Sequence, residues 1–90
     1  MIARQVFYEG RVQDVGFRFT CKQMARGYDV VGWVRNLPDG RVELQCSGER
    51  EEVDGFLEAI AESELKSHIR NATAIPIPVF VGVRGFEIVA

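Results

Sequence analysis

The chain has 90 residues, 47% of them apolar, and a formal net charge of −2. That length suits one small domain, near the size at which a core only just outweighs conformational entropy, and that apolar content argues against disorder. The slightly acidic charge argues against a nucleic-acid partner and against a polybasic membrane anchor. No apolar stretch approaches the roughly 20 residues that span a bilayer, and the N-terminus lacks the parts of a signal peptide, so we expect a cytoplasmic protein.

The first predicted strand covers residues 6–12 and leads into a basic loop bounded by glycines. Residues 10–18 read Gly-Arg-Val-Gln-Asp-Val-Gly-Phe-Arg. Where a strand passes into a helix through such a loop, free backbone N–H groups gather at the positive end of the helix dipole and form an anion site. Arg18 adds a planar fork of donors that suits phosphate oxygens. The alternative is a plain strand-to-helix connection with a solvated arginine.

A helix follows the loop, with apolar residues at helical spacing: Phe17, Cys21, Met24 and Ala25. Gly27 is placed to end it. The next predicted strand covers residues 30–37, and one of its faces carries Val30, Gly32, Val34 and Asn36. Leu37-Pro38-Asp39-Gly40 has the chemistry of a turn, because proline presets φ and glycine tolerates a positive φ.

The third predicted strand covers residues 41–46 and alternates between apolar and polar side chains. Its inward positions are Val42, Leu44 and Cys46, and its outward positions are Arg41, Glu43 and Gln45. Together with the preceding strand and turn it forms a predicted hairpin.

A second helix carries one apolar stripe, made of Val53, Phe56, Leu57, Ile60 and Ala61, with Glu51 and Glu52 complementing the dipole at its start. Residues 69–77 are predicted as a strand, which Pro76 and Pro78 confine to a sheet edge or to its own end. A short final strand covers residues 85–89. Between these two strands lies an apolar stretch, residues 80–83, which we expect to cover the edge of the core; the alternative is a contact patch.

The order β-α-β-β-α-β predicts an α+β fold over residues 1–90 as a single domain. It is the ferredoxin-like split βαβ sandwich, an antiparallel sheet with two helices on one face. This fold hosts many functions, RNA binding on the open sheet face among them. Residues 41–46 have no aromatic side chain for base stacking and present an acid outward, which disfavours RNA.

Two segments of the chain carry a resemblance to the acylphosphatase family. GRVQDVGFR and GWVRNLPDGRVELQCSG resemble the family signatures G-x-V-Q-G-V-G-F-R and G-W-V-x-N-x-x-x-G-x-V-x-x-x-x-x-G, in the family order. The resemblance runs along essentially the whole chain. It implies the same fold and hydrolysis of the carboxyl–phosphate anhydride of acylphosphates. Because the chain begins at Met1 and ends soon after its last predicted strand, we expect a small free-standing member.

The resemblance also implies a site. Arg18 and Asn36 are the implied catalytic residues, with Arg18 gripping the phosphate and Asn36 positioning the attacking water. The implied phosphate cradle consists of the backbone N–H groups of Gln13, Asp14, Val15, Gly16, Phe17 and Arg18. Since phosphoryl transfer is mostly positioning and charge stabilisation, such a site can act without metal or cofactor. The expected partners are an acylphosphate substrate and inorganic phosphate, with neither nucleic acid nor membrane, and the expected state is a monomer.

One residue departs from the first signature, because Asp14 stands where the family has glycine. If that glycine has a positive φ, a Cβ there is strained, and a carboxylate beside a bound phosphate repels it. The departure leaves an alternative function open. The chain would then be a catalytically weakened or inactive relative that binds anions or serves as a contact module.

The two cysteines and the single histidine give no metal or redox pattern. Cys21 and Cys46 are too far apart in sequence for a CxxC motif, and His68 has no nearby cysteine partner. We therefore expect no metal site and two buried thiols that act as small hydrophobic side chains.

Overall fold

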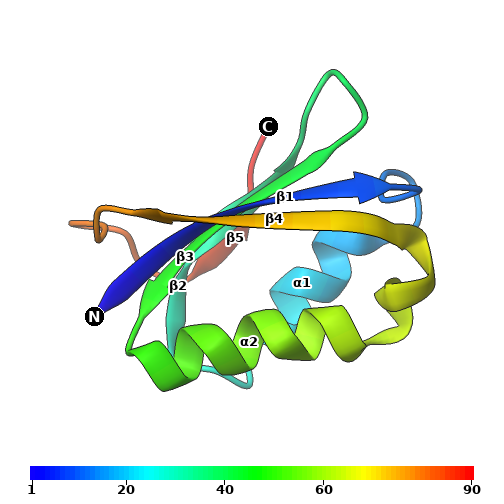
Figure 1. Ribbon diagram of the computed structural model, residues 1–90. Coiled ribbons are helices and arrows are strands. Elements are labelled where there is room, and N and C mark those ends of the chain that lie inside the picture. Colours follow the sequence, from blue (N-terminus) through cyan, green and yellow to red (C-terminus); the bar gives the residue numbers. More distant parts are fainter.

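The computed structural model describes residues 1–90 and has two layers, a twisted sheet and two α-helices beneath one of its faces (Figure 1). No helix is long and apolar enough to cross a membrane. The elements are β1 (Ile2–Gly10), α1 (Phe17–Ala25), β2 (Val30–Asn36), β3 (Val42–Gly48), α2 (Arg50–Glu62), a 3₁₀ turn (Glu64–His68), β4 (Ile69–Ile77) and β5 (Phe86–Ile88).

The sheet has the strand order β4-β1-β3-β2-β5. β1 runs antiparallel to β3 and β4, and β2 runs antiparallel to β3, as the split βαβ plan requires. The prediction of an antiparallel sheet is wrong in one place, because β5 is parallel to β2. The chain leaves β4 at Ile77, beside Ala3, at the end of the sheet where β2 begins. A short connection therefore returns it to that same end, and β5 has to start where β2 starts.

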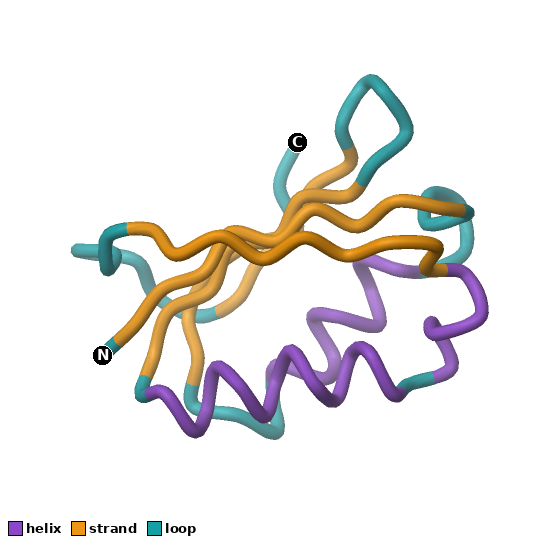
Figure 2. Tube along the Cα trace, in the orientation of Figure 1, coloured by secondary structure: helices purple, strands orange, loops and turns teal.

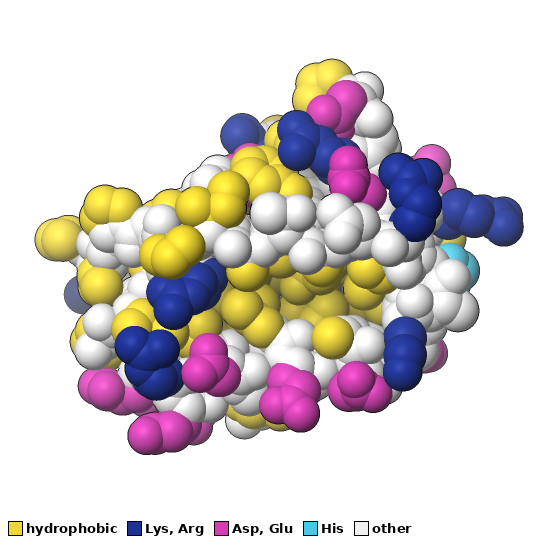
Figure 3. Space-filling view, viewed as in Figure 1, with side chains coloured by type: hydrophobic (Ala, Val, Ile, Leu, Met, Phe, Trp, Pro, Cys, Tyr) yellow, Lys and Arg dark blue, Asp and Glu magenta, His cyan; other side chains and the backbone are white.

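The core lies between the sheet and the two helices, which Figure 2 shows on one side of the strands. Its helical side chains come from the predicted stripes: Phe17, Cys21 and Ala25 from α1, and Val53, Phe56 and Ile60 from α2. Of the other predicted positions, Met24 and Leu57 are partly buried against the core, and Ala61 is exposed. The inward positions of the hairpin, among them Val34, Leu44 and Cys46, complete it. Acidic side chains gather along the outer face of α2 (Figure 3). Both free thiols, Cys21 and Cys46, are fully buried in the core, as predicted, and burial raises the pKa of each to about 12.

The bounds of β1 differ most from the sequence prediction, while those of β2, β3 and β5 differ by one or two residues. β1 begins at Ile2 and ends at Gly10, earlier than the predicted residues 6–12, because it pairs with β3 from Ile2 onward despite polar side chains at Arg4 and Gln5. Val12 is buried as a strand residue would be, but it belongs to the loop that follows β1. β4 covers the predicted residues and lies at the sheet edge, as Pro76 and Pro78 require.

The apolar stretch at residues 80–83 does not cover the core, contrary to the prediction. Val81 is 95% exposed, and Gly82 turns the chain there with a φ of 78°. The edge of the core is closed instead by Phe86, which is buried and packs edge-on against Phe56 with ring centroids 5.3 Å apart.

The outward face of β3 is not fully open to solvent. Glu43 points away from the helices as predicted, yet its side chain is only 5% exposed. It accepts hydrogen bonds from Gln5 at 2.6 Å, Arg35 at 2.9 Å and Gln45 at 3.2 Å. The open face of the sheet therefore has a buried, charged centre rather than a line of independent polar groups.

Candidate active site

The loop between β1 and α1 is held in an unusual backbone path. Gly10, Asp14 and Gly16 all have positive φ, at 128°, 63° and 77°. Only glycine fits at position 10, because a Cβ there would collide with the carbonyl oxygen of His68, which also accepts the Arg11 N–H at 2.9 Å. The loop is thus bent back on itself before α1 begins.

The bend leaves a run of backbone donors without acceptors. None of the N–H groups of Gln13 to Gly16 has a hydrogen bond within the protein, and the first helical bond of α1 is from Thr20 N–H to the Gly16 oxygen, at 2.9 Å. The free donors lie at the N-terminal end of α1, where the helix dipole is positive. This is the local structure of an anion site.

Asn36 comes to the same place from the end of β2. Its Oδ1 atom is buried and has no hydrogen-bond partner. An orphaned buried acceptor is costly unless a water or ligand satisfies it, so this oxygen is a candidate position for such a group.

The loop and Asn36 border one cavity of about 170 Å³. Its lining residues are Val12, Asp14, Gly16, Phe17, Arg18, Phe19, Asn36 and Ile88. Five of the residues implied as site residues are therefore brought together: Asp14, Gly16, Phe17, Arg18 and Asn36. Gln13 and Val15 lie outside the lining. Arg18 takes part in no ion pair, which leaves its guanidinium available.

Gln13 has a contact that sequence reasoning missed. Its side-chain Nε2 donates to the carbonyl oxygens of Leu37, at 2.8 Å, and Arg41, at 3.0 Å. These carbonyls close the turn of the β2–β3 hairpin, next to Asn36. The side chain of Gln13 thus ties the loop with the free N–H groups to the hairpin that carries Asn36. No local signal reveals the contact, since its partners are 24 and 28 residues away.

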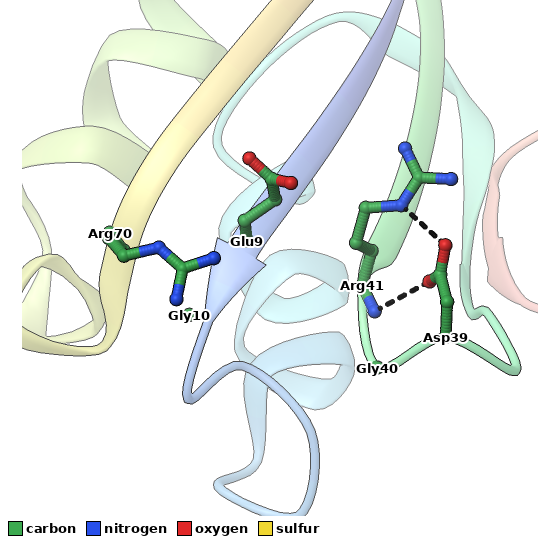
Figure 4. A pocket seen from close by; sticks show the side chains of 6 residues that line it. All are labelled: Glu9, Gly10, Asp39, Gly40, Arg41 and Arg70. Atoms are coloured by element: carbon green, nitrogen blue, oxygen red, sulfur yellow. Dashed lines mark hydrogen bonds and ion pairs between the residues drawn. The ribbon is translucent and has the colours of Figure 1, made fainter.

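A larger cavity, of about 520 Å³, lies beside the hairpin turn and is a weaker candidate. Figure 4 shows Arg41 turned toward Asp39, with Glu9 and Arg70 on the other side. Asp39 neutralises Arg41 at 2.9 Å, and the Arg41 guanidinium also lies over the ring of Phe7. The lining residues include two acids, Glu9 and Asp39, and two cations, Arg41 and Arg70, of which Arg41 is already paired. This cavity is therefore less suited to an anion than the smaller one.

No group of three or more His, Cys, Asp or Glu side chains is placed to hold a metal ion. The 170 Å³ cavity offers free N–H groups, an unpaired arginine and an orphaned amide oxygen. Donors of this kind suit an oxyanion, and an acceptor of this kind suits a water or a hydroxyl group. Fold and site together define a small α+β domain whose strand-to-helix loop has the local structure of an anion site.

The comparisons with known proteins specify the family within that class. A sequence model of the acylphosphatase family matches residues 4–88. The acylphosphatase of Rubrobacter xylanophilus is 39% identical over 93% of this chain and 76% of its own length, and that of Bacillus velezensis is 35% identical over 98% of both. The crystal structure of acylphosphatase from Bacillus subtilis has a TM-score of 0.90 at 31% identity, over the full length of both chains.

The chain therefore belongs to the acylphosphatase family, which confirms the resemblance carried by the two signatures. By class it is an enzyme, a hydrolase that acts on acid anhydrides.

Proposed function

We propose that this protein hydrolyses the carboxyl–phosphate anhydride of acylphosphates at the 170 Å³ cavity. The phosphate oxygens accept hydrogen bonds from the loop N–H groups and from the Arg18 guanidinium. The observation that carries the proposal is the buried Asn36 Oδ1 without a partner, on a residue that lines the same cavity as Asp14, Gly16 and Arg18. It accepts a hydrogen bond from a water and holds it beside the phosphorus.

The chemistry balances with these residues alone. The water oxygen attacks phosphorus, the bond from phosphorus to the acyl oxygen breaks, and the carboxylate leaves with the electron pair. The proton of the water passes to a phosphate oxygen. Since a carboxylate is a good leaving group, neither a general acid nor a Lewis acid is needed. Catalysis consists of positioning and of stabilising negative charge.

The test is hydrolysis of acetyl phosphate by the purified chain and by Asn36→Ala. A residue that orients water acts mainly in the transition state, so kcat is expected to fall roughly 100-fold with little change in KM. Asn71→Ala, an exposed asparagine on β4, is the matched control and keeps full activity. A thermal melt of each variant separates lost folding from lost chemistry. A large rise in KM with kcat intact would show that Asn36 binds substrate instead.

The second candidate function is an anion-binding relative with weak turnover or none. It is favoured by Asp14, an acidic residue that lines the cavity and has a φ of 63°. Inorganic phosphate that binds at this site without any hydrolysis of acetyl phosphate would support it over the enzyme.

A further inference from the structure

The 170 Å³ cavity has two kinds of wall. Asp14, Gly16, Arg18 and Asn36 form its polar part, and Val12 and Phe17 are buried behind it. The two remaining lining residues, Phe19 and Ile88, are apolar but open to solvent, at 60% and 38% exposure. They come from the first turn of α1 and from β5, the parallel strand at the far edge of the sheet.

Phe19 has no structural role that accounts for its position. It lies two residues beyond Phe17, on the side of α1 away from the core stripe of Phe17, Cys21 and Ala25, and it belongs to none of the aromatic pairs. A large apolar side chain that lines a cavity and is kept in water gains from contact with an apolar group of a ligand.

We propose that Phe19 and Ile88 bind the acyl group of the substrate, and that the preferred acyl group is apolar and uncharged, aromatic or several carbons long. The proposal rests on the acylphosphate hydrolysis argued above. In an acylphosphate only one oxygen separates phosphorus from the acyl carbon. A phosphate held by Arg18 and the loop therefore places the acyl group against the neighbouring wall, which consists of these two side chains.

The charges around the cavity support the same class of substrate. Arg18 is the only cation among the lining residues, and in the proposed complex it is already paired with the phosphate. The one other charged lining residue is Asp14. An acyl group with its own carboxylate or second phosphate thus finds no cation to pair with and is repelled by Asp14.

The test compares four substrates: acetyl, benzoyl, butyryl and succinyl phosphate. The last two differ mainly by a terminal carboxylate. In Phe19→Ser the ratio of kcat/KM for benzoyl phosphate to that for acetyl phosphate is expected to fall about five- to tenfold, the lower part of the range for losing one apolar contact. Ratios between variants cancel the intrinsic reactivity of each substrate. Val81→Ser, at an exposed valine outside the cavity, is the matched control and keeps the wild-type ratio.

Two further variants test the apolar wall and the charge of Asp14 separately. Phe19→Leu, which keeps an apolar wall, retains more of the benzoyl preference than Phe19→Ser. Asp14→Asn raises kcat/KM for succinyl phosphate more than for butyryl phosphate. Equal loss on all substrates in Phe19→Ser, no loss on any, or a wild-type preference for succinyl over butyryl phosphate would overturn the proposal while leaving acylphosphate hydrolysis intact. A wild-type chain that hydrolyses none of the four would overturn the proposed function itself, and the acyl preference with it.

Discussion

Asp14 is the only non-glycine residue of the chain with a positive φ, and it lies in the middle of the loop that carries the free N–H groups. The left-handed conformation costs a residue with a Cβ roughly 1–2 kcal/mol, somewhat less for aspartate. A carboxylate ~6 Å from a bound phosphate would repel each unit of its charge by about 3 kcal/mol at an effective dielectric of ~20, and solvent around this exposed side chain reduces that. Repulsion and strain both act against anion binding.

Restoring glycine at position 14 should therefore improve the site. Asp14→Gly is expected to raise kcat/KM for acetyl phosphate, by up to roughly tenfold if the carboxylate stays near the phosphate. Asp14→Asn separates the causes, because it removes the charge and keeps the Cβ. If kcat/KM rises in both variants, charge repulsion is the main cause of the weak site. If kcat/KM rises in Asp14→Gly alone, backbone strain is the main cause. If neither variant binds phosphate or turns over substrate better than wild type, Asp14 is harmless.

Phosphate binding should weaken even when Arg18 is replaced by lysine, the other basic residue with a long side chain. A guanidinium forms two parallel hydrogen bonds to a phosphate, and an ammonium group does not reproduce them. Arg18→Lys is expected to weaken competitive inhibition by inorganic phosphate roughly tenfold or more, with a fall in kcat/KM. Arg26→Lys, at an exposed arginine after α1, serves as the control. Phosphate inhibition that is unchanged in Arg18→Lys would remove this residue from the site.

At the scale of elements, the site is divided between two pieces of chain that the fold brings together. The donors belong to the β1–α1 loop, and the orphaned acceptor belongs to the end of β2. The side chain of Gln13 links the two pieces through the carbonyls of Leu37 and Arg41. These carbonyls also accept backbone hydrogen bonds within the turn, from Gly40 N–H at 3.1 Å and Leu37 N–H at 2.8 Å. Loss of the Gln13 contact should therefore affect alignment more than stability.

Gln13→Met tests this link, because methionine keeps the length of the side chain and removes its donors. We expect kcat/KM to fall about tenfold while unfolding loses only about 1 kcal/mol. Gln23→Met, on the exposed side of α1, is the control. In a background of Asn36→Ala, Gln13→Met should lower kcat little further, because its effect acts through the placement of Asn36. Additive losses would mean that Gln13 acts independently.

At the scale of the whole molecule, the sheet separates a helix-covered face from an open one, and the open face is organised around Glu43. Burial by itself would raise the pKa of this carboxyl, but hydrogen bonds from Gln5, Arg35 and Gln45 outweigh burial and hold the pKa below its ordinary value. The folded state therefore prefers the ionised form. Stability from Glu43 is present above the unfolded pKa and is lost as the pH falls through the lower folded pKa.

The loss of unfolding free energy in Glu43→Gln should accordingly depend on pH. The variant is expected to unfold more easily than wild type by about 1–2 kcal/mol at pH 7, because a charged acceptor is replaced by a neutral one. The difference should shrink as the pH falls below about 4 and the wild-type carboxyl becomes protonated. Urea denaturation at several pH values measures it. Glu58→Gln, on the exposed face of α2, controls for general acid effects, and a difference independent of pH would contradict the charged network.

Much of the architecture could be predicted because it depends on neighbours in sequence. Helical and alternating patterns located both helices, the hairpin and the core positions, and paired signatures indicated the family. The sequence patterns did not predict features that depend on residues far away in the chain. β1 starts before its apolar pattern does because β3 pairs with it, and Glu43 is buried by donors from three strands.

The order of elements, the family and the loop with its arginine could all be predicted from the amino-acid sequence, because spacing, turn chemistry and signature residues are local properties. Four features became visible only in the folded chain: the parallel pairing of β5, the exposure of Val81, the hydrogen bonds from Gln13 to the hairpin turn, and the placement of Phe19 and Ile88 around one cavity. Each of these depends on which distant segments the sheet places side by side. Contacts of that kind follow from chain closure and packing of the whole core, which no window of sequence contains.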